Sequence, residues 1–497
     1  MRIHFLPKSI PLAIMTFVVL IAEVLFLLLL TGLDILPGKY LVLIIAVLFI
    51  ADLAAFILMS SRKKVTFQRM VGLIMALLIL NGIGMGSEYV YSTYDTFQKI
   101  SEIKAQYEDY HVIVLKNSSY HSVRAIEDKP VSVIKMDSKM YQEAQEKLQT
   151  EVSVKFEKKA DCLEVGNQLL GEKEGADEPV IFVSNANYKM LCEELDSFQG
   201  NTKKLYTLSV KKRTDDDAKR INVTEDPFNL YISGIDIWGD IEQVSRSDVN
   251  MIMTVNPQTK KILLTSIPRD SYVELHSYGA LDKLTHSGIY GIDETLKTVE
   301  DWMDIDLNYY ARINFSMLVD VVNAIGGIDV ESKFAFKSKI SKYTYKVGMN
   351  HLDGKAALYF ARERKAFKAQ DEERIRNQQI VLKAIIDKIT TSPALLTGYP
   401  KILDAVEGEM QTNLSNKDIA ALVKMQIRDL GGWEIESINI SGTDAMKPTY
   451  SMGSRELFVS IPKEETVEAA KEKIHEVMYP SENLKEEELK EQDLVKK

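Results

Sequence analysis

The chain has 497 residues, which is too long for one domain at roughly 150 residues per domain. Its formal net charge of −10 argues against a general nucleic-acid-binding protein, because such proteins are normally basic. The two cysteines, Cys162 and Cys192, form no CxxC pair and have no histidine cluster nearby, so we do not expect a zinc site. One disulfide outside the cell would account for them, and two buried free thiols would do so at least as well.

Three apolar runs dominate the first ninety residues: Ile10–Leu30, Tyr40–Met59 and Met70–Gly86. Each is near the ~20 residues needed to cross a bilayer, whereas a cleavable signal peptide would be a single run. Basic residues gather before the first run and between the second and third (Arg2, Lys8, Arg62, Lys63, Lys64 and Arg69). The positive-inside rule then predicts a multi-pass plasma-membrane protein. Residues 1–9 would be cytoplasmic, residues 10–87 would hold three transmembrane helices, and the bulk of the chain would be extracellular.

Two acidic residues, Glu23 and Asp52, fall inside these spans, where charge is costly. They would serve either a proton or ligand site, or a hydrogen bond between helices or to a partner protein. We favour the second interpretation, because no transport-like series of polar residues accompanies them.

Residues 94–222 are predicted to form an accessory domain outside the membrane. The amphipathic stretch Tyr94–Tyr110 has the spacing of a helical stalk, and short strand-like and helix-like runs then alternate. We expect strands at 112–115, 131–134, 152–156, 180–184 and 205–210, and helices at 138–148, 161–170 and 187–198. This order predicts a small α/β domain, and we identify no catalytic constellation in it. A charged linker, Lys211–Asp226, follows.

Residues 226–462 are predicted to form one three-layer α/β/α domain with a mixed central sheet. Its first strand runs from Phe228 and ends in Asp236, Arg246 and Asp248 precede the next strand, and a third strand leads into Arg269. Acids beside arginines at strand ends suit Mg²⁺, which takes one or two carboxylates together with water and phosphate oxygens. The alternative is that Asp236 and Asp248 only cap loops.

Further helices are expected at 293–303, 316–325, 354–361, 370–389, 394–407 and 416–430, with strands at 309–315 and 435–440. Residues 463–497 are acidic and lysine-rich with few apolar positions, so we expect a charged tail there that begins as a remnant of helix and grades into disorder.

The most informative feature is a set of four arginines within residues 362–376. Arg362 and Arg364 point the same way only if the chain is extended between them. Arg374 and Gln378 share a helix face, with Asp371 one turn earlier on the same side. Arginine forks suit phosphate oxygens, although a salt-bridged surface helix would show the same composition. No Gly-rich phosphate loop or nucleophile motif appears, and His286 would either touch a substrate or be structural.

As a set, these blocks resemble the LytR–CpsA–Psr (LCP) family of bacterial envelope proteins. The blocks are Gly234-Ile-Asp236 with Arg246-Ser-Asp248, Ser266-Ile-Pro-Arg269-Asp270, Arg312-Ile-Asn-Phe315, His351-Leu-Asp-Gly354 with Arg362-x-Arg364, and Asp371 with Arg374 and Gln378-Gln379. Three spans followed by an accessory domain further resemble the capsule-locus branch of streptococci and their relatives. Many relatives have arginine before the Gln-Gln pair, where this chain has Asn377.

The resemblance implies a phosphotransferase that moves a glycan, most often capsular polysaccharide in that branch, from undecaprenyl pyrophosphate to a peptidoglycan sugar. Arg246, Arg269, Arg362, Arg364, Arg374 and Gln378 would bind the pyrophosphate, and Asp236 and Asp248 would hold Mg²⁺. Arg269, Arg362, Arg364 and Asp371 would be catalytic, with Asp248 or Asp371 either taking a proton or orienting an arginine. The apolar helices 316–325 and 375–389 would line a tunnel for the lipid.

Three alternatives remain at this point. The chain could regulate capsule transcription, although only about residues 1–9 and 60–69 would face the cytoplasm, so no direct nucleic-acid contact is expected. It could bind the lipid-linked glycan without catalysis, or transfer the phosphate to water as a pyrophosphatase. Contacts with other capsule-assembly proteins in the membrane are compatible with each of these.

Overall fold

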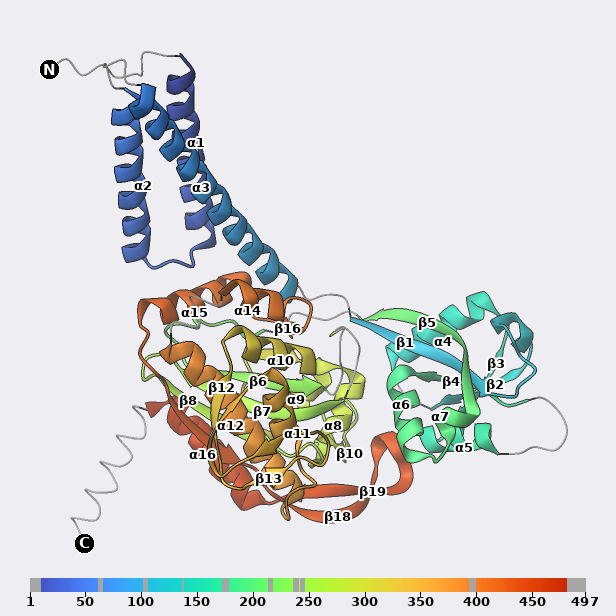
Figure 1. Ribbon diagram of the computed structural model, residues 1–497. Helices are drawn as coiled ribbons and strands as arrows, with labels where there is room; N and C mark the ends of the chain where they lie inside the picture. Colours follow the sequence, from blue (N-terminus) through green and yellow to red (C-terminus); the bar gives the residue numbers. More distant parts are fainter. Residues whose placement is uncertain are drawn as a thin grey trace, which may run out of the picture.

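The computed structural model describes residues 10–60, 66–101, 106–135, 138–171, 178–212, 218–235, 241, 246–392 and 399–480. Three parts are visible in Figure 1: a bundle of N-terminal helices at the top, a large α/β domain beneath it, and a smaller α/β domain to one side.

The bundle consists of α1 (Ile10–Leu33), α2 (Gly38–Met59) and α3 (Thr66–Ser101), each long and apolar enough to cross a membrane. Both α1 and α2 pack on α3. A Cβ on Gly72 of α3 would lie 2.8 Å from the Met59 side chain and 3.0 Å from the Ala55 carbonyl oxygen, so glycine permits the close approach of α2 and α3. The third helix continues well beyond the predicted span.

The predicted stalk is partly wrong, because α3 ends at Ser101 and a strand begins at Gln106. Tyr107 and Tyr110, which the prediction placed in a helical stalk, instead lie on strand β1, where they pair with Lys211 and Leu208 of β5. Pairing with strands distant in the sequence therefore overrides the local helical spacing.

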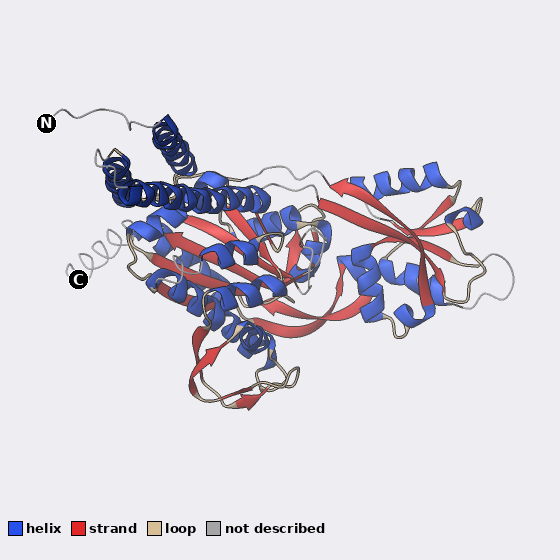
Figure 2. Cartoon of the chain, turned by 45° about the horizontal axis from the view of Figure 1, so that its top comes forward, coloured by secondary structure: helices blue, strands red, loops and turns tan. Residues whose placement is uncertain are grey.

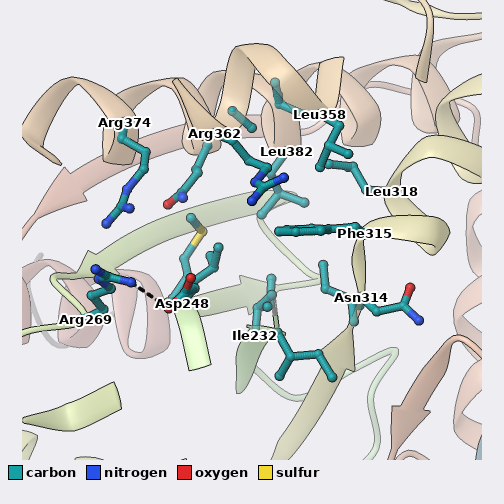
Figure 3. Close-up of a pocket in the computed structure, with 18 of the residues that line it drawn as sticks. Ile232, Asp248, Arg269, Asn314, Phe315, Leu318, Leu358, Arg362, Arg374 and Leu382 are labelled. Carbon is teal, nitrogen blue, oxygen red and sulfur yellow. Dashed lines mark hydrogen bonds and ion pairs between the residues drawn. The ribbon is translucent and has the colours of Figure 1, made fainter. Parts of the chain in front are cut away.

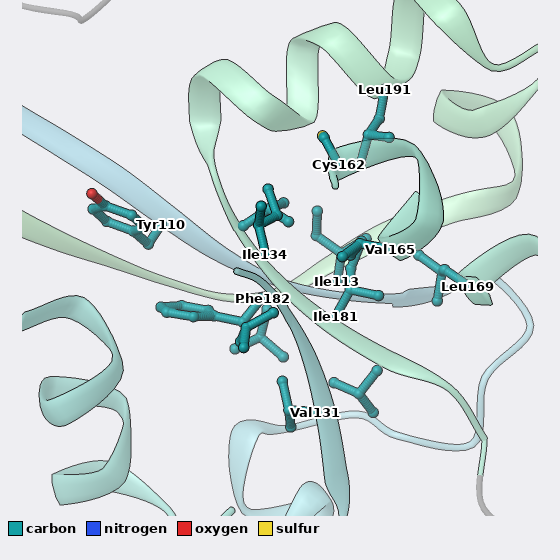
Figure 4. Close-up of a cluster of buried hydrophobic side chains, with 14 of the residues drawn as sticks. Tyr110, Ile113, Val131, Ile134, Cys162, Val165, Leu169, Ile181, Phe182 and Leu191 are labelled. Atoms are coloured by element: carbon teal, nitrogen blue, oxygen red, sulfur yellow. The ribbon is translucent and has the colours of Figure 1, made fainter. Parts of the chain in front are cut away.

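The accessory domain is built on a five-stranded sheet in the order β3-β2-β4-β1-β5. Its elements are β1 (Gln106–Leu115), η1 (Val123–Ile126), β2 (Pro130–Ile134), α4 (Lys139–Glu151), β3 (Lys155–Lys159), α5 (Cys162–Leu170), β4 (Val180–Ser184), α6 (Asn185–Glu194), α7 (Phe198–Asn201) and β5 (Thr202–Lys212). The side chains of Ser138, Asp161 and Ser184 accept hydrogen bonds from the first turns of α4, α5 and α6, which explains where these helices begin. Figure 4 shows the core, in which Ile113, Phe182 and Leu191 are fully buried.

Both cysteines are free thiols in this structure, so the possible disulfide is not formed. Cys162 is buried in the accessory core, which fits the alternative of buried thiols for this residue, whereas Cys192 is only half-buried.

The large domain has a six-stranded sheet in the order β16-β11-β6-β7-β8-β17, with β11–β6 and β8–β17 parallel and the other pairs antiparallel. The strands are β6 (Phe228–Ile235), β7 (Ser247–Asn256), β8 (Lys261–Ile267), β11 (Tyr309–Ile313), β16 (Met410–Thr412) and β17 (Glu434–Asn439). The sheet is therefore mixed, as predicted.

Helices cover both faces of this sheet, which confirms the three-layer architecture (Figure 2). Alternation along the strands explains this: Tyr231 packs on one face with α8 (Leu284–Ser287), α9 (Ile292–Met303) and α16 (Glu464–Met478), whereas Leu230 and Ile232 pack on the other with α12 (Gln370–Thr391) and α15 (Asn416–Arg428). A further cluster joins α10 (Phe315–Ala324), α11 (Gly354–Arg362) and α14 (Tyr399–Val406) to α12. Of the helix predicted at 394–407, residues 394–398 lie outside the described residues.

The structure goes beyond the prediction in two places. The expected helix remnant after Pro462 is a full helix, α16, which buries Val467, Ala470 and Ile474, spaced at three and four residues, against the sheet. The other place is a set of short elements that were not predicted: α8 and β16, together with β9 (Tyr272–Leu275), β10 (Ala280–Lys283), η2 (Gly288–Tyr290), β12 (Ile328–Ser332), β13 (Phe336–Lys337), β14 (Thr344–Tyr345), β15 (Gly348–Leu352), β18 (Gly442–Thr449), η3 (Tyr450–Met452) and β19 (Gly453–Pro462). Residues 481–497 lie outside the described residues.

The large domain contacts both other parts of the molecule. The β18–β19 hairpin reaches the accessory domain, where Met452 and Leu457 join the core and Arg455 pairs with Glu194 at 3.2 Å (Figure 1). At the other contact, Phe97 and Ile100 of α3 pack with residues of α14 and α15. The arrangement holds the large domain next to the bundle of N-terminal helices.

Candidate active site: an arginine-lined cavity

The candidate site begins where β6 and β7 meet at one end of the sheet. Their antiparallel register pairs Gly234 with Val249 and Ile235 with Ser247, which brings Asp248 beside the end of β6. A Cβ on Gly234 would lie 2.8 Å from Val249 Cβ, so glycine allows the strands to approach here. The predicted ligand Asp236 follows Ile235 directly and lies outside the described residues.

A cavity of about 360 Å³ lies between this end of the sheet and helices α10, α11 and α12 (Figure 3). One part of its wall is charged, and the other is apolar. The charged part comprises Asp248, Arg269, Arg362, Arg364, Lys365 and Arg374, and the apolar part includes Ile232, Met251, Ile313, Phe315, Leu318, Leu358, Val381, Leu382 and Ile385. Such a cavity suits an amphiphile with an anionic head and an apolar tail.

Arg269, directly after β8 and Pro268, is held by two carboxylates. Its Nη1 donates to Asp248 Oδ1 at 2.9 Å, and its Nε lies 3.4 Å from Asp270 Oδ2. Burial alone would lower the pKa of Arg269, but the charges of Asp248 and Asp270 outweigh it and hold the pKa above its usual value. Burial would likewise raise the pKa of Asp270, yet Lys283 and Arg269 keep that pKa below its usual value. The guanidinium is therefore fixed and charged beside the cavity.

Arg362 and Arg364 enter the same cavity, as their spacing predicted for an extended chain. The helix α11 ends at Arg362, and Glu363 is extended with φ −71° and ψ 128°. The guanidinium of Arg362 lies over the Phe315 ring, 4.1 Å from its centroid, in a cation–π contact. Glu363, between these two arginines, is 0% exposed, so the alternative of a salt-bridged surface helix does not hold at this residue.

On α12, Arg374 and Gln378 line the cavity, and Asp371 steadies two of the arginines. Asp371 Oδ1 lies 3.2 Å from Arg374 Nη2 and 3.6 Å from Arg364 Nη1. Burial, together with the nearby guanidinium groups, lowers the pKa of Arg374 despite the Asp371 charge. Its Nε is buried and has no hydrogen-bond partner among the described residues, as expected of a donor that awaits an anion.

The neighbouring side chains on α12 have other roles. Arg376 pairs with Glu373 at 3.0 Å and does not line the cavity. Gln379 faces the sheet, where its amide donates to Ser266 Oγ at 2.9 Å and to the Ile438 carbonyl at 3.1 Å. The two adjacent glutamines therefore have different roles. Gln378 lines the cavity, and Gln379 binds α12 to the sheet through hydrogen bonds.

Several expectations need correction or extension. Arg246 is not among the residues that line the cavity. His286 is buried, with Nδ1 2.6 Å from Asp282 Oδ1 and 2.9 Å from Ser451 Oγ, which gives it a structural role. The apolar wall includes the predicted helices α10 and α12, but α11 and the strand residues Ile232, Met251 and Ile313 contribute as well.

Phe315 and Lys365 also line the cavity and were not predicted as site residues. The only sequence signal for Phe315 was its place in the Arg312-Ile-Asn-Phe315 block. Arg312 itself is buried and donates to the Ile241 carbonyl at 3.1 Å, and burial lowers the pKa of Arg312 to about 10.

Glu23 and Asp52 line a second cavity, of about 400 Å³, between α1 and α2. Among the described residues, Glu23 Oε1 is buried without a hydrogen-bond partner. The favoured hydrogen bond between helices is therefore not formed at this oxygen.

Comparison with known proteins assigns the chain to a family. A family model described as the LytR_cpsA_psr family matches residues 194–473, more than half of the chain. The chain belongs to the LytR–CpsA–Psr (LCP) family. A polyisoprenyl-teichoic acid–peptidoglycan teichoic acid transferase, TagU, of Enterococcus faecalis is 33% identical over 230 residues, which cover 46% of this chain and 74% of that one. TagT of Bacillus subtilis, which has the same description, is 36% identical over 236 residues, covering 46% and 71%.

Among solved structures, this LCP chain is similar to TagV of Bacillus subtilis, with 28% identity and a TM-score of 0.43 over 51% of this chain and 98% of that one. TagT bound to LIIa-WTA has 29% identity and a TM-score of 0.43, over 54% and 96%.

Proposed function

We propose that this LCP protein transfers a glycan from a polyprenyl pyrophosphate carrier to a sugar hydroxyl of peptidoglycan, and that the glycan is capsular polysaccharide. The observation that carries the proposal is the cavity itself, because four arginines and an apolar wall meet in one space. The relatives described as transferases of polyisoprenyl-linked teichoic acid support the same reaction class. The capsular cargo rests on the resemblance of the three-helix anchor and accessory domain to the capsule-locus branch.

The chemistry follows from the charges. The acceptor hydroxyl oxygen attacks the phosphorus next to the glycan, a new P–O bond forms, and the pyrophosphate P–O bond breaks. The products are a glycan–peptidoglycan phosphodiester and a polyprenyl monophosphate, and the hydroxyl proton leaves to a base or to the departing phosphate. Negative charge grows on that phosphate, and Arg269, Arg364 and Arg374 are fixed where they can stabilise it.

Asp248 and Asp371 were each considered as a base or as a residue that orients an arginine. In the structure both accept arginine contacts, Asp248 from Arg269 and Asp371 from Arg364 and Arg374. We therefore assign both carboxylates an orienting role.

We also propose that Mg²⁺ binds at this site. Of the two predicted ligands, Asp248 lines the cavity next to Arg269, so one carboxylate stands beside the space that the phosphates would occupy, and carboxylate and phosphate oxygens are the ligands that Mg²⁺ prefers. Asp236, the second, lies outside the described residues. When bound, the ion would neutralise charge on the pyrophosphate oxygens. Asp248→Asn should raise the Mg²⁺ concentration needed for half-maximal transfer, and an unaltered titration would remove Asp248 from the ligand set.

The three apolar helices support a membrane anchor, and the distribution of basic residues supports a cytoplasmic N-terminus with the cavity outside. The polyprenyl chain would then enter the apolar part of the cavity from the outer leaflet. No nucleotide is needed, because the pyrophosphate bond supplies the driving force.

The test uses the full chain in lipid nanodiscs, given a lipid-pyrophosphate-linked glycan, Mg²⁺ and peptidoglycan fragments. Mass spectrometry would detect a phosphodiester-linked product. Arg364→Ala should abolish product with little change in thermal stability, whereas Arg376→Ala, outside the cavity, should leave it nearly unchanged. Bound lipid without product in the wild type would favour a non-catalytic binder, and free glycan phosphate would favour a pyrophosphatase.

A further inference from the structure

A strongly basic surface adjoins the cavity but plays no part in the proposed chemistry. Residues 333–346 contain five lysines and no acidic residue, a net charge of +5 in a chain with a net charge of −10. Five exposed lysines lie on or beside the β13–β14 hairpin: Lys333, Lys337, Lys339, Lys342 and Lys346. We call residues 333–346 the lysine hairpin. None of these five side chains forms an ion pair within the described part of the chain.

The lysine hairpin is firmly seated on the domain. Phe336 and Tyr345 are buried, with ring centroids 4.7 Å apart, and both pack against Phe360 of α11. The Tyr345 hydroxyl donates to the Ala356 carbonyl at 2.8 Å. The lysines therefore project from a fixed platform rather than from a loose loop, which reduces the entropy lost when they bind a ligand.

The hairpin is also joined to the arginine pair. The buried carboxylate of Glu363, between Arg362 and Arg364, accepts hydrogen bonds from Ser338 Oγ and from the Lys339 amide, each at 2.7 Å. At the hairpin turn, Ile340 lines the cavity itself. The lysine surface is thus continuous with the cavity wall near the arginines.

The surface faces away from the membrane anchor. Figure 1 places β13 at the end of the large domain opposite α14 and α15, the helices that contact α3. Figure 2 agrees, with the short strands at the edge of the domain far from α1–α3. Lipid headgroups around the anchor are therefore not the natural occupant, whereas a polymer that extends from the cavity away from the membrane would cross this surface.

We propose that the lysine hairpin is a remote subsite for negative charge on the glycan chain, beyond the pyrophosphate. This inference rests on the proposed function. Phosphate or carboxylate groups of the repeat units would be attracted by ammonium point charges, which tolerate variable spacing better than arginine forks do. Binding energy from this remote part of the donor can be used in the transition state, so glycan charge and length should raise kcat/KM.

The binding test uses the full chain in nanodiscs of zwitterionic lipid, with fluorescent poly(glycerol phosphate) as the probe and neutral dextran as its control. The variant is Lys337→Glu/Lys342→Glu/Lys346→Glu. Its matched control is Lys116→Glu/Lys155→Glu/Lys158→Glu, which reverses three exposed accessory-domain lysines. Affinity is measured over a range of salt concentrations, because release of condensed counterions makes polyanion binding salt-dependent.

We expect the hairpin variant to lose about tenfold or more in affinity for poly(glycerol phosphate), with a shallower salt slope, while the matched control stays close to wild type. Farnesyl pyrophosphate, which has no glycan, should bind both variants equally, and this shows that the cavity is intact. Equal polymer affinity in the hairpin variant and the wild type would overturn the proposal. So would a loss confined to phosphatidylglycerol vesicles, which would assign the surface to lipid.

Transfer assays separate this proposal from the proposed function. Donors with a charged or a neutral glycan are compared in the wild type. If neither donor is transferred, the proposed function is wrong. The polymer-binding assay would then still test whether the lysine hairpin binds an anionic polymer. If both are transferred with the same kcat/KM, the remote subsite fails alone.

Discussion

Each of the two α/β domains outside the helical bundle packs helices on a sheet, but one forms a closed core and the other leaves a cavity. In the accessory domain the sheet and its helices close on each other, and residues such as Ile113, Val165 and Leu169 are completely buried. In the large domain the corresponding space between the sheet and α10, α11 and α12 holds a cavity of about 360 Å³. Close packing is the ordinary state of a protein interior, so an open apolar space implies a ligand.

The placement of charge differs in the same way. Accessory-domain ion pairs such as Lys147–Glu143 lie on the surface, where they contribute little to stability. In the large domain the side chains of Arg269 and Arg374 are only 25% and 12% exposed, and acids hold them at a cavity wall. Charge that is buried and oriented in this manner is costly unless it serves binding or catalysis, so function concentrates in the large domain.

The largest effect is expected from removing one of these arginines. Arg374→Ala should lower the transfer rate by about 10²–10³-fold, the usual loss for one preorganised donor. Asp371 keeps Arg364 as a partner, so the fold should survive. Steady-state kinetics would measure the rate, with Arg124→Ala on the accessory domain as the control. If the two variants lost equal activity, the contrast between the domains would be wrong.

The contrast in packing can be tested with one substitution made in each domain. Leu169→Trp, in the closed accessory core, should cost about 1–3 kcal/mol or more through overpacking. Leu318→Trp has open cavity in front of it, so it should cost less stability and instead block the lipid. Thermal unfolding and farnesyl pyrophosphate binding would be measured together. Unimpaired lipid binding by Leu318→Trp would show that this wall does not contact the tail.

The junction between cavity and hairpin is expected to be the next most sensitive point. Glu363→Gln keeps the shape of a side chain that accepts from Ser338, Lys339 and Ala366, but it removes the charge and one acceptor. Because this group is fully buried, local stability should fall by about 1–3 kcal/mol.

Hydrogen exchange would report this loss as faster exchange at the Lys339 and Ala366 amides. Glu178→Gln, at a half-buried position in the accessory domain, is the control. Unchanged protection at both amides would show that the Glu363 charge does not stabilise the junction with the lysine hairpin.

Much of this fold could be predicted from the sequence because its main elements are long and periodic. The strand that begins at Phe228 and the helix from Gln370 were found for that reason. The spacing of Arg362 and Arg364 stated only a condition, an extended chain between them, which the structure meets at Glu363. The two-residue strands β13 and β14 have no period to detect. The helix α16 was expected only as a remnant, because it has three buried apolar positions among charges and nothing local indicates the sheet that covers them.

The site was predictable in part for a related reason. Arginines that share a helix face or an extended turn can be placed from spacing, but a cavity wall is assembled from distant segments. Phe315 and Ile340 therefore gave no signal of their own, although both line the cavity. Arg246 had the right chemistry and sequence neighbourhood, yet the cavity is lined without it.

The smallest effect we predict concerns Asp270, which is 8% exposed and lies 3.1 Å from Lys283 Nζ. Burial would raise the pKa of this carboxyl, but Lys283 and Arg269 lower it more, so the pKa lies below the ordinary value of 3.8. A group whose pKa is depressed by folding stabilises the protein above its unfolded pKa, and this stability is lost as the pH falls through the folded value. Asp270→Asn should therefore destabilise the protein near pH 7 but not in strong acid.

The expected loss is about 1 kcal/mol, the difference between a charge-assisted and a neutral hydrogen bond to Lys283. Urea unfolding of wild type and variant from pH 7 down to about pH 2 would measure it. The two stabilities should converge at the acid end, since protonation of Asp270 removes the charge that the variant lacks. A gap that persisted below the folded pKa would mean that the Asp270 side chain contributes through its shape and not through its charge.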